Sequence, residues 1–378
     1  MIDVIVIGGG VTGCGVAWDL ALRGLGVTLL ERGSLASGSS GRFHGLVHSG
    51  ARYAVSDPAA AAQCARESAV LARIAPRLVH PTGGLFALFP DDDAGYVEPW
   101  EAGIRGAGVS AVEIPAAEAL RREPLLSPAL RRAYLVQDAV CEGPALCAAL
   151  AAAARSAGAV VLDFHRVDDF LSDGGSILGV RAVDIRTGEP VRLECRLVVL
   201  AAGPWCGEIL SHAGLKLTLN LLRGAMVALD GPRLSTSVNR LQPPSDGDIA
   251  LPRGRMTIAG TTSIPIDRPD DKRVDDGEIV LIRERVFDML PGLRESTARH
   301  SWSGVRPLFE QLPAADVHEW SRDFTVIDHE ARDRMEGLVT VVGGKLTTFR
   351  LMAEKTADAV CRQLDVPAAC RTAETIFS

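Results

Sequence analysis

The chain begins with two short apolar runs separated by a glycine-rich turn and a helical segment. Residues 3–7 (DVIVI) and 27–30 (VTLL) are apolar runs of strand length, and the alanine-rich segment between them predicts a helix that extends to Arg23. Apolar runs rich in β-branched residues are typical of strands buried on both faces. The pattern therefore predicts a βαβ unit of a parallel sheet at the start of the chain.

A G-x-G-x-x-G motif stands between the first strand and the helix. Gly8 permits the tight turn, Gly10 lets the backbone approach a pyrophosphate, and Gly13 lets the helix pack closely on the strand. The helix N-terminus then faces the phosphates. Glu31, at the end of the second strand, can accept hydrogen bonds from the hydroxyls of an adenosine ribose. The alternative is an ordinary glycine turn with a surface glutamate, but four parts in register favour a dinucleotide site.

The identity of the dinucleotide depends on whether a second site exists. Downstream, the glycine pairs Gly174-Gly175 and Gly343-Gly344 do not open another strand–turn–helix unit. The first pair lies in a Ser-Asp-Gly-Gly-Ser sequence, which is a hairpin turn signal. One nucleotide site in a chain of 378 residues leaves two alternatives: NAD with a separate catalytic domain, or FAD reduced directly by a substrate.

Further helices and strands follow the first unit. Asp57-Pro58 is an N-cap followed by proline at the first helical position, and the helix extends to about Ala75. The other expected elements are a helix over 144–157, a strand over 160–164, a hairpin over 178–183 and 191–195, a buried strand and turn over 196–205, and an amphipathic closing helix over 347–365. The polar segments 243–248 and 267–276 are expected to be solvated loops.

The segment 31–53 differs from its surroundings in composition. It is rich in glycine and serine and also contains histidines and arginines. Such a composition suits a loop whose backbone amides and hydroxyls follow a phosphate chain. We therefore interpret it as a cofactor loop and not as a linker.

Composition and charge limit the function. The chain is 47% hydrophobic and carries a net charge of −7, so it can bury a large core as two domains or as one interleaved unit. An acidic balance argues against a general nucleic-acid surface, because phosphate backbones are bound by a basic excess. Any anionic ligand must therefore meet locally clustered arginines.

The eight cysteines are scattered without a C-x-x-C pair, which argues against a zinc or iron–sulfur site. We expect them to be small packing residues in a reducing cytoplasm. No signal peptide is expected, because the first apolar run is a strand followed by a glycine turn. No apolar stretch of about 20 residues is long enough to span a bilayer.

Three segments carry a family resemblance. The run 30–53, the sequence SGVRPL at 303–308 and the sequence GGKLTTFR at 343–350 resemble the FAD-dependent glycerol-3-phosphate dehydrogenases. The resemblance is greatest to the catalytic subunit of the anaerobic enzyme and covers essentially the whole chain. It implies that the cofactor is FAD.

The resemblance also implies the fold. We expect an α/β chain with a Rossmann-like FAD-binding domain of the glycine/D-amino-acid oxidase type, interleaved with a substrate domain built on an antiparallel sheet (α+β). The FAD-binding domain is expected to comprise residues 1–80, 141–214 and 321–378. The substrate-binding domain is expected to comprise residues 81–140 and 215–320.

The activity implied by the resemblance is the oxidation of a phosphorylated secondary alcohol. The leading reaction converts sn-glycerol 3-phosphate to dihydroxyacetone phosphate by hydride transfer to flavin N5. His48 matches the family's active-site histidine and is the candidate base, since an imidazole can take a proton near neutral pH. A role in hydrogen bonding the cofactor or the backbone is the alternative for His48. Arg306 matches a residue beside the reacting oxygen.

The substrate phosphate is expected to meet several cations. The family correspondence places Arg52, Arg322 and Lys345 around it, and Tyr53 is expected to line the same pocket. Arginine donates two parallel hydrogen bonds to phosphate, whereas lysine acts as a point charge. Any one of these cations alone would be more typical of a surface ion pair. Their convergence would imply a dianionic substrate.

The resemblance extends to the cofactor contacts. Backbone amides of residues 343–347 are expected near the flavin pyrimidine, where they stabilise negative charge on the reduced ring, and the strand near Val167 is expected to meet the adenine. The full set of expected cofactor residues is Gly8, Gly10, Gly13, Glu31, Arg32, Ser39, Ser40, Arg42, His44, Gly45, Val167, Ala202, Gly203, Trp205, Gly343, Gly344, Lys345, Leu346 and Thr347.

Two departures from the family affect these expectations. Met226 stands where membrane-type relatives have a histidine, which shifts the base role to His48 or a water. Relatives also continue beyond the closing helix into a helical cap or an iron–sulfur region, whereas this sequence stops at Ser378. The electron acceptor therefore remains undetermined: a partner protein, a quinone, a soluble acceptor and oxygen are the alternatives.

Other functions remain as alternatives. The same scaffold could oxidise another polyol phosphate, a 2-hydroxy acid or an amine, and a flavin subunit that only binds a partner would have a damaged site. We expect a cytoplasmic protein, with peripheral contact at the inner membrane face as the alternative, although no basic amphipathic segment is evident.

Overall fold

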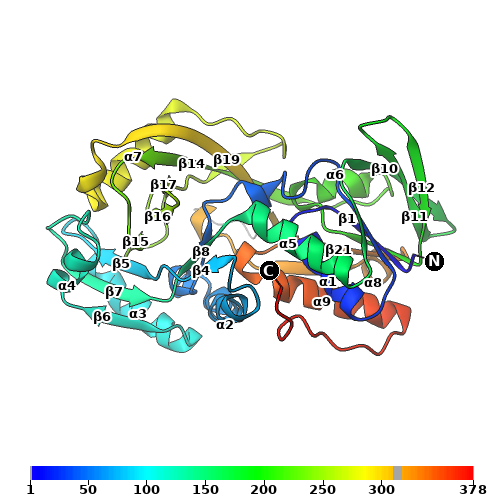
Figure 1. Cartoon of the computed structure of the whole chain (residues 1–378), viewed down its shortest axis with the longest axis horizontal. Helices are drawn as coiled ribbons and strands as arrows, with labels where there is room; N and C mark the ends of the chain where they lie inside the picture. Colours follow the sequence, from blue (N-terminus) through cyan, green and yellow to red (C-terminus); the bar gives the residue numbers. More distant parts are fainter. Residues whose placement is uncertain (1, 310–316, 378) are drawn as a thin grey trace.

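The computed structural model describes residues 2–309 and 317–377, which form two lobes side by side (Figure 1). One lobe is built on a six-stranded sheet in the order β20-β21-β13-β1-β2-β9. Its strands are β1 (Val4–Ile7), β2 (Val27–Leu30), β9 (Val160–Leu162), β13 (Leu197–Leu200), β20 (Phe324–Asp328) and β21 (Leu338–Gly343). β1 pairs in parallel with both β2 and β13, and the edge strand β20 is antiparallel to β21. The predicted βαβ unit is confirmed.

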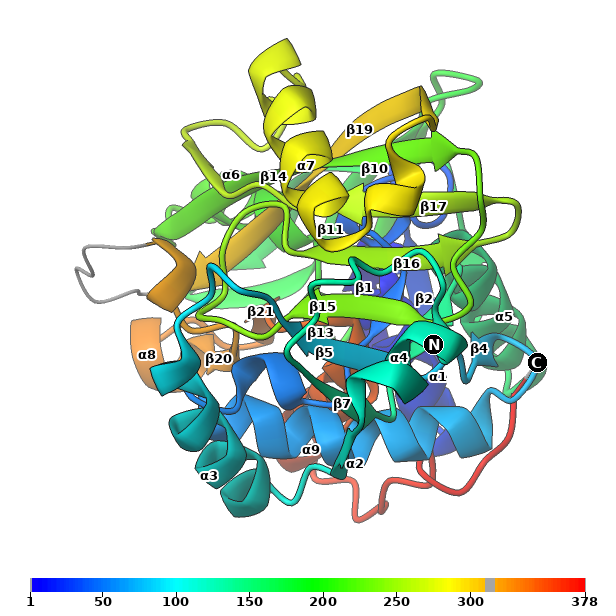
Figure 2. The same ribbon diagram turned by 90° about the vertical axis from the view of Figure 1, so that its left-hand side faces the viewer.

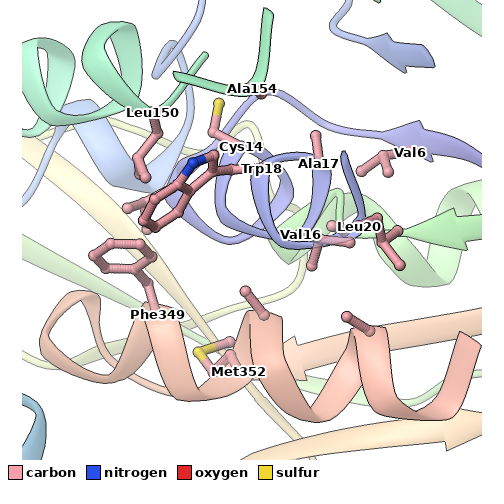
Figure 3. Close-up of a cluster of buried hydrophobic side chains, with 14 of the residues drawn as sticks. Val6, Cys14, Val16, Ala17, Trp18, Leu20, Leu150, Ala154, Phe349 and Met352 are labelled. Atoms are coloured by element: carbon pink, nitrogen blue, oxygen red, sulfur yellow. The ribbon is translucent and has the colours of Figure 1, made fainter. Parts of the chain in front are cut away.

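Three helices form the core on one side of this sheet. α1 (Val11–Leu22) packs between α5 (Gly143–Ser156) and α9 (Phe349–Leu364). Figure 3 shows Trp18 of α1 between Leu150 of α5 and Phe349 of α9, and the Trp18 side chain is only 2% exposed. All three helices lie within one or two residues of their predicted bounds. The core forms because small residues on α1 let its neighbours approach closely.

Two small sheets extend this lobe. The strands β3 (Leu46–Val47), β8 (Ala139–Cys141) and β4 (Val79–His80) form one of them. The other contains β10 (His165–Asp173), β11 (Ser176–Asp184) and β12 (Pro190–Glu194). Gly174 and Gly175 both have positive φ angles, 57° and 94°, in the turn between β10 and β11. The glycine pair therefore makes the hairpin turn that the sequence predicts.

The second lobe is a nine-stranded sheet, predominantly antiparallel, whose strands come from residues 84–136 and 219–309. The helix α7 (Asp276–Met289) packs against β14 and β17 (Figure 2). The strands are β5 (Gly84–Leu88), β6 (Ala111–Ile114), β7 (Arg132–Val136), β14 (Leu219–Asp230), β15 (Ser237–Arg240), β16 (Ile249–Arg253), β17 (Met256–Gly260), β18 (Ile264–Ile266) and β19 (Thr297–Phe309).

The remaining helices connect or cover the sheets. α2 begins where predicted, because the Asp57 side chain accepts a hydrogen bond from the Ala60 amide at 3.0 Å. The helices are α2 (Pro58–Ile74), α3 (Val97–Ala107), α4 (Ala116–Arg122), α6 (Cys206–Ser211) and α8 (His329–Asp333).

Of the two polar segments expected to be solvated loops, 267–276 is a largely exposed loop as predicted, whereas 243–248 is partly buried and the prediction was wrong there. Asp248, at the end of segment 243–248, is 1% exposed. In segment 267–276, Asp271 and Asp275 each lie 3.4 Å from the guanidinium of Arg223, which is 3% exposed. Acids of both segments form ion pairs with buried arginines that lie far away in the sequence. The polar composition of a segment does not reveal such distant partners.

The cysteine thiols are all free, and six of the eight are buried. Burial raises the pKa of Cys206 to about 12, so this thiol is protonated and unreactive at neutral pH. Within residues 2–309 and 317–377, no helix is long and apolar enough to cross a membrane. The same residues contain no cluster of three or more His, Cys, Asp or Glu side chains suited to a metal ion.

Candidate active site

The glycine motif forms an open cradle at the N-terminus of α1. Gly8 has a φ angle of 112°, and a Cβ atom added at Gly13 would lie 1.9 Å from the Gly8 carbonyl oxygen. The N-cap residue of α1 is Gly10, which has no side chain to cap the helix. The Val11 amide donates to Ser40 Oγ at 2.9 Å. The amides of the first turn that remain after this bond suit an anionic group such as a pyrophosphate. The cradle therefore fits a dinucleotide.

Glu31 stabilises this cradle from the end of β2. Its carboxylate accepts hydrogen bonds from the Gly9 amide at 2.7 Å and from the Gly33 amide at 2.8 Å. Ser37 Oγ also donates to this carboxylate at 3.3 Å, so of its about four acceptor positions about one remains for a ribose hydroxyl. Glu31 thus shapes the glycine turn itself, a role that the motif alone did not indicate.

The cofactor loop is fixed to the second lobe. Ser39 Oγ donates to the Val305 carbonyl at 2.5 Å, and Trp302 Nε1 donates to the Arg42 carbonyl at 3.2 Å. At Gly304 a Cβ atom would lie 2.7 Å from the Arg42 oxygen, so only glycine permits this approach. The loop and β19 are therefore held edge to edge, on the two sides of one cavity.

That cavity has a volume of about 1550 Å³, including open solvent at its mouth, and residues of both lobes line it. The predicted residues that line it are Ser39, Ser40, Arg42, His44, His48, Arg52, Tyr53, Arg306, Arg322, Gly343, Gly344, Lys345, Leu346 and Thr347. The other predicted cofactor residues, Gly8, Gly10, Gly13, Glu31, Arg32, Gly45, Val167, Ala202, Gly203 and Trp205, are not part of its lining.

Several of these other residues gather around the glycine cradle. A Cβ at Gly8 would lie 2.6 Å from the Ala201 carbonyl oxygen, so the turn at 201–203 directly contacts the cradle. The Arg32 guanidinium lies 4.2 Å from the Trp205 ring centroid, which is a cation–π contact. Val167 lies on β10, a strand that packs against the end of β2. These positions surround the place where the adenosine end of a dinucleotide would extend.

Two neutral histidines lie in the cavity wall. The ring of His48 contacts the rings of His44 and Tyr53 edge to face, with centroids 5.6 and 5.3 Å apart. Burial, His44 and the cations Arg52 and Lys345 hold the pKa of His48 well below its usual value. Burial and nearby arginines lower the pKa of His44 to about 3. His48 is therefore unprotonated at neutral pH and can accept a proton.

The tautomer of His44 is set by the backbone. Its Nδ1 accepts a hydrogen bond from the Leu46 amide at 2.9 Å, so the proton of the neutral ring is on Nε2. His48 is held through its own amide, which donates to Thr347 Oγ1 at 3.0 Å. The ring of His44 thus has a fixed orientation and can only donate from Nε2, whereas the hydrogen bond of His48 fixes its backbone.

Arg306 faces the cavity without a carboxylate partner among the residues that the structure describes. Its guanidinium donates to Thr261 Oγ1 at 2.6 Å and to the Thr262 carbonyl at 3.1 Å. Burial and the neighbouring Arg322 lower the pKa of Arg306 to about 9. The group remains a cation at neutral pH, and Asp246 offsets its charge only from beyond ion-pair distance, which favours an anionic ligand.

Arg322 and Lys345 form a second cationic pair in the same wall. Lys345 Nζ donates to the Arg322 carbonyl at 2.9 Å and lies 4.7 Å from the Tyr53 ring centroid. Arg322 Nη1 is buried and has no hydrogen-bond partner in the described part of the chain. Burial lowers the pKa of both cations. Because Arg322 also lines the cavity, this unpartnered N–H is available to donate to a ligand there.

Arg52 differs from these cations. Its Nη2 donates to Asp248 Oδ1 at 2.8 Å, and both side chains are largely buried. Burial opposes the charge, but the Asp248 carboxylate raises the pKa of Arg52 above its usual value. The family resemblance places the Arg52 charge at the substrate phosphate, but the Asp248 carboxylate already compensates that charge inside the protein.

Sequence reasoning missed several residues of the cavity wall. Ser245 lies in a segment taken for a solvated loop, and Thr261 and Ser263 follow β17 without any motif. His318 lies in the wall and its Nε2 is 3.3 Å from Asp246 Oδ1. Met226, which the sequence singled out only as a departure, is also part of the lining. No sequence signal marks these positions, because they reach the cavity through long-range folding.

Comparison with known proteins is consistent with this geometry. The family model described as FAD dependent oxidoreductase (DAO) matches residues 3–359. The chain is 40% identical to the A1 subunit of anaerobic glycerol-3-phosphate dehydrogenase from Haloferax volcanii, over 98% of this chain and 65% of that protein. It is also 40% identical to the corresponding subunit of the Escherichia coli K12 enzyme, over 98% of this chain and 69% of that protein. The chain thus spans about two thirds of these relatives.

Two solved structures share the fold. The glycerol-3-phosphate dehydrogenase of Bacillus halodurans complexed with FAD superposes with a TM-score of 0.78 at 28% identity, covering 100% of this chain and 68% of that chain. Glycine oxidase from Geobacillus kaustophilus gives a TM-score of 0.78 at 25% identity, covering 100% and 98%. The expected fold, a Rossmann-like domain of the glycine oxidase type with a second sheet, is confirmed.

Proposed function

The chain belongs to the family of FAD dependent oxidoreductases, and we propose that it oxidises sn-glycerol 3-phosphate to dihydroxyacetone phosphate. One observation carries the proposal. Arg306, Arg322 and Lys345 line one cavity beside a neutral His48, and none of the three cations has a carboxylate partner within residues 2–309 and 317–377. A dianionic alcohol would supply the missing negative charge.

The cofactor fits the cradle described above. The open amides at the start of α1 suit the pyrophosphate, and Glu31 has an acceptor position left for the ribose. Leu346 and Thr347 follow the glycine pair at the end of β21 and line the cavity, where their amides would approach the flavin. When bound, FAD supplies the acceptor for a hydride.

The phosphate end of the substrate would be held by Arg322 and Lys345. Arg322 Nη1 is the unpartnered donor, and Lys345 Nζ is bound to the backbone carbonyl of the same residue. Tyr53 closes the same wall, and burial raises the pKa of Tyr53 to about 12, so its hydroxyl is a donor at neutral pH. Contacts with the phosphate would position the substrate so that its alcohol carbon points toward the reaction site.

At the reacting end, oxidation removes a hydride from the alcohol carbon and a proton from its hydroxyl. We assign proton acceptance to an imidazole nitrogen of His48, which is neutral before substrate binds. A dianionic substrate offsets the positive charge of Lys345, one of the cations that lower the pKa of His48, so the imidazole becomes more basic as substrate binds. Arg306 stabilises the oxygen as its proton leaves.

The electrons must then leave the reduced cofactor. The relatives from Haloferax volcanii and Escherichia coli are named as subunits, which supports transfer to a partner protein or a quinone and not to oxygen. A cytoplasmic location, with contact at the inner membrane face through that partner, belongs to the same proposal. Oxygen uptake by the reduced protein should therefore be slow compared with reduction of a soluble dye.

Anaerobic bleaching of the flavin absorbance tests the function. The holoprotein is mixed with sn-glycerol 3-phosphate, glycerol, L-lactate or glycine at equal concentration. We expect rapid bleaching by the first compound alone, because the others lack the dianionic phosphate. If lactate or glycine bleaches the flavin and sn-glycerol 3-phosphate does not, the cavity belongs to a hydroxy-acid or amine oxidase and the proposal is wrong.

A further inference from the structure

The guanidinium of Arg306 is oriented by one short segment of chain. Nη2 donates to Thr261 Oγ1 at 2.6 Å, and Nη1 donates to the Thr262 carbonyl at 3.1 Å and to Ser263 Oγ at 3.4 Å. All three acceptors come from the connection between β17 and β18. The position of Arg306 therefore depends on how firmly residues 261–263 are held.

The guanidinium of Arg306 also lies close to the backbone of β14. A Cβ atom added at Gly224 of β14 would lie 2.5 Å from Arg306 Nη2 and 2.8 Å from Nη1. The guanidinium thus contacts the β14 backbone as well as the segment 261–263. If that segment shifts, Arg306 loses the hydrogen bonds that orient it.

Thr262 anchors the segment to the interior. Its side chain is fully buried, and its hydroxyl accepts a hydrogen bond from the Ala225 amide at 2.9 Å. The same hydroxyl donates to Glu278 Oε1 at 2.6 Å. The hydroxyl of Thr262 is therefore held between the Ala225 amide of β14 and the Glu278 carboxylate of α7, which ties residue 262 of the segment to both elements.

Glu278 is itself locked in place. It lies in the first turn of α7, is 8% exposed, and its Oε2 accepts from Arg223 Nη2 at 2.6 Å. The same oxygen accepts the Asp275 amide at 3.1 Å, which completes a capping box. Removing either partner of this buried ion pair would leave the other charge uncompensated, so the pair holds Glu278 firmly in this arrangement.

We propose that Glu278 is a positioning residue, which acts through Thr262 to hold Arg306 at the wall of the active-site cavity. The carboxylate touches neither the cavity nor Arg306, and its effect passes through two hydrogen bonds. The inference rests on the proposed function in one respect, namely that Arg306 stabilises the reacting oxygen. The alternative is that Glu278 serves only to cap α7.

The test compares Glu278→Gln and Thr262→Val with a matched control, Asp275→Asn. Asp275 shares the capping box and the Arg223 ion pair with Glu278 but makes no contact with Thr262. The measured quantity is the limiting rate of anaerobic flavin reduction by sn-glycerol 3-phosphate, per bound flavin, in the holoprotein. We expect both test variants to be slower by about 10- to 100-fold, the cost of a misplaced catalytic group.

A second readout separates positioning from general damage. The Kd of inorganic phosphate, measured by flavin fluorescence, should change little in Glu278→Gln and Thr262→Val, because Arg322 and Lys345 do not contact this network. Thr262→Ser keeps the hydroxyl and should restore most of the reduction rate. Asp275→Asn should lower the thermal midpoint while reducing flavin at nearly the wild-type rate.

The outcomes distinguish the inference from the function on which it rests. Arg306→Lys serves as the reference, since the conservative change keeps the charge but loses the hydrogen-bond geometry. If Arg306→Lys reduces flavin at the wild-type rate, both the role of Arg306 and the inference are wrong. If Arg306→Lys is slow but Glu278→Gln and Thr262→Val behave like Asp275→Asn, the inference alone is overturned.

Discussion

Arg52 Nη2 lies 2.8 Å from Asp248 Oδ1, which joins the loop after His48 to the segment between β15 and β16. The Asp248 side chain is 1% exposed and the Arg52 side chain 13% exposed, so the pair is a buried one. Asp248 Oδ2 also accepts a hydrogen bond from the Ser245 amide at 2.9 Å, which fixes the orientation of the carboxylate. The pair thus closes one wall of the cavity and removes one cation from the set available to a ligand.

Replacing Asp248 by Asn should destabilise the protein and increase its affinity for anions. Breaking a buried ion pair by removing one partner costs about 3–5 kcal/mol, because the other charge stays buried and uncompensated. The freed Arg52 guanidinium would then bind phosphate, so phosphate should raise the thermal midpoint more in Asp248→Asn than in wild type. Thermal unfolding with and without phosphate measures both effects.

The control is Asp230→Asn, which removes an exposed ion pair with Arg299. Surface pairs contribute about 0–1 kcal/mol, so its midpoint and its response to phosphate should be nearly those of wild type. Equal anion responses in Asp248→Asn and wild type would show that Arg52 does not turn toward the cavity.

Loss of either phosphate-facing cation should weaken substrate binding while the cofactor stays bound. For Arg322→Ala and Lys345→Ala we expect KM for sn-glycerol 3-phosphate to rise by about 10- to 100-fold, the equivalent of a charge-assisted hydrogen bond. Steady-state kinetics and the flavin-to-protein absorbance ratio are the measurements. Equal loss of flavin would indicate that these residues hold the cofactor instead of the substrate.

Acidification should destabilise the fold through the buried histidines. The pKa of His44 is lowered to about 3, so between pH 6.5 and 3 the unfolded chain binds a proton at this site that the folded chain does not. The free energy of unfolding is then unchanged above the pKa that His44 has in the unfolded chain. Below that pKa it falls by about 1.4 kcal/mol per pH unit for one such group. Thermal unfolding of the holoprotein between pH 5 and 7 should show this slope.

His44→Asn tests the source of that slope. The amide oxygen of Asn can accept the Leu46 amide in place of Nδ1, but it does not titrate. The variant should therefore lose stability less steeply with falling pH than wild type. An unchanged slope would assign the effect to other groups.

Substitution at the cradle should prevent cofactor binding. In Gly13→Ala the new Cβ would lie 1.9 Å from the Gly8 carbonyl oxygen, so helix α1 and the turn must separate. We expect the purified protein to lack flavin, as measured by its absorbance. Gly106→Ala is the control, since nothing lies within 4 Å of its Cβ position in helix α3, and the change should stabilise by about 0.5–1 kcal/mol.

The sequence predicted those parts of the structure that local patterns encode. The cradle at Gly8–Gly13, the N-cap at Asp57 and the hairpin at Gly174-Gly175 each depend on residues adjacent in the chain. The family resemblance added residues such as His48 and Arg306, which no local pattern marks, and the cavity brings them together.

The errors share a physical cause. Segment 243–248 was expected to be solvated because it is polar, yet Asp248 is buried by an arginine 196 positions away. The sequence did not predict a role for Thr261, Thr262 or Glu278. Hydrogen bonds between a loop and a helix leave no periodic signature in the sequence. Charge compensation across the fold is a property of three-dimensional contacts, and a single sequence does not display it.

The bond from Ser39 to Val305 joins residues 266 positions apart, and it links the cofactor loop to a strand of the other lobe. A bound cofactor that orders this loop would therefore slow amide hydrogen exchange in β19, although β19 belongs to the sheet of the second lobe. Exchange at Val305 and its neighbours becomes a local reporter of cofactor occupancy. The two lobes should then open as one cooperative unit in the holoprotein and as separate units once the cofactor has dissociated.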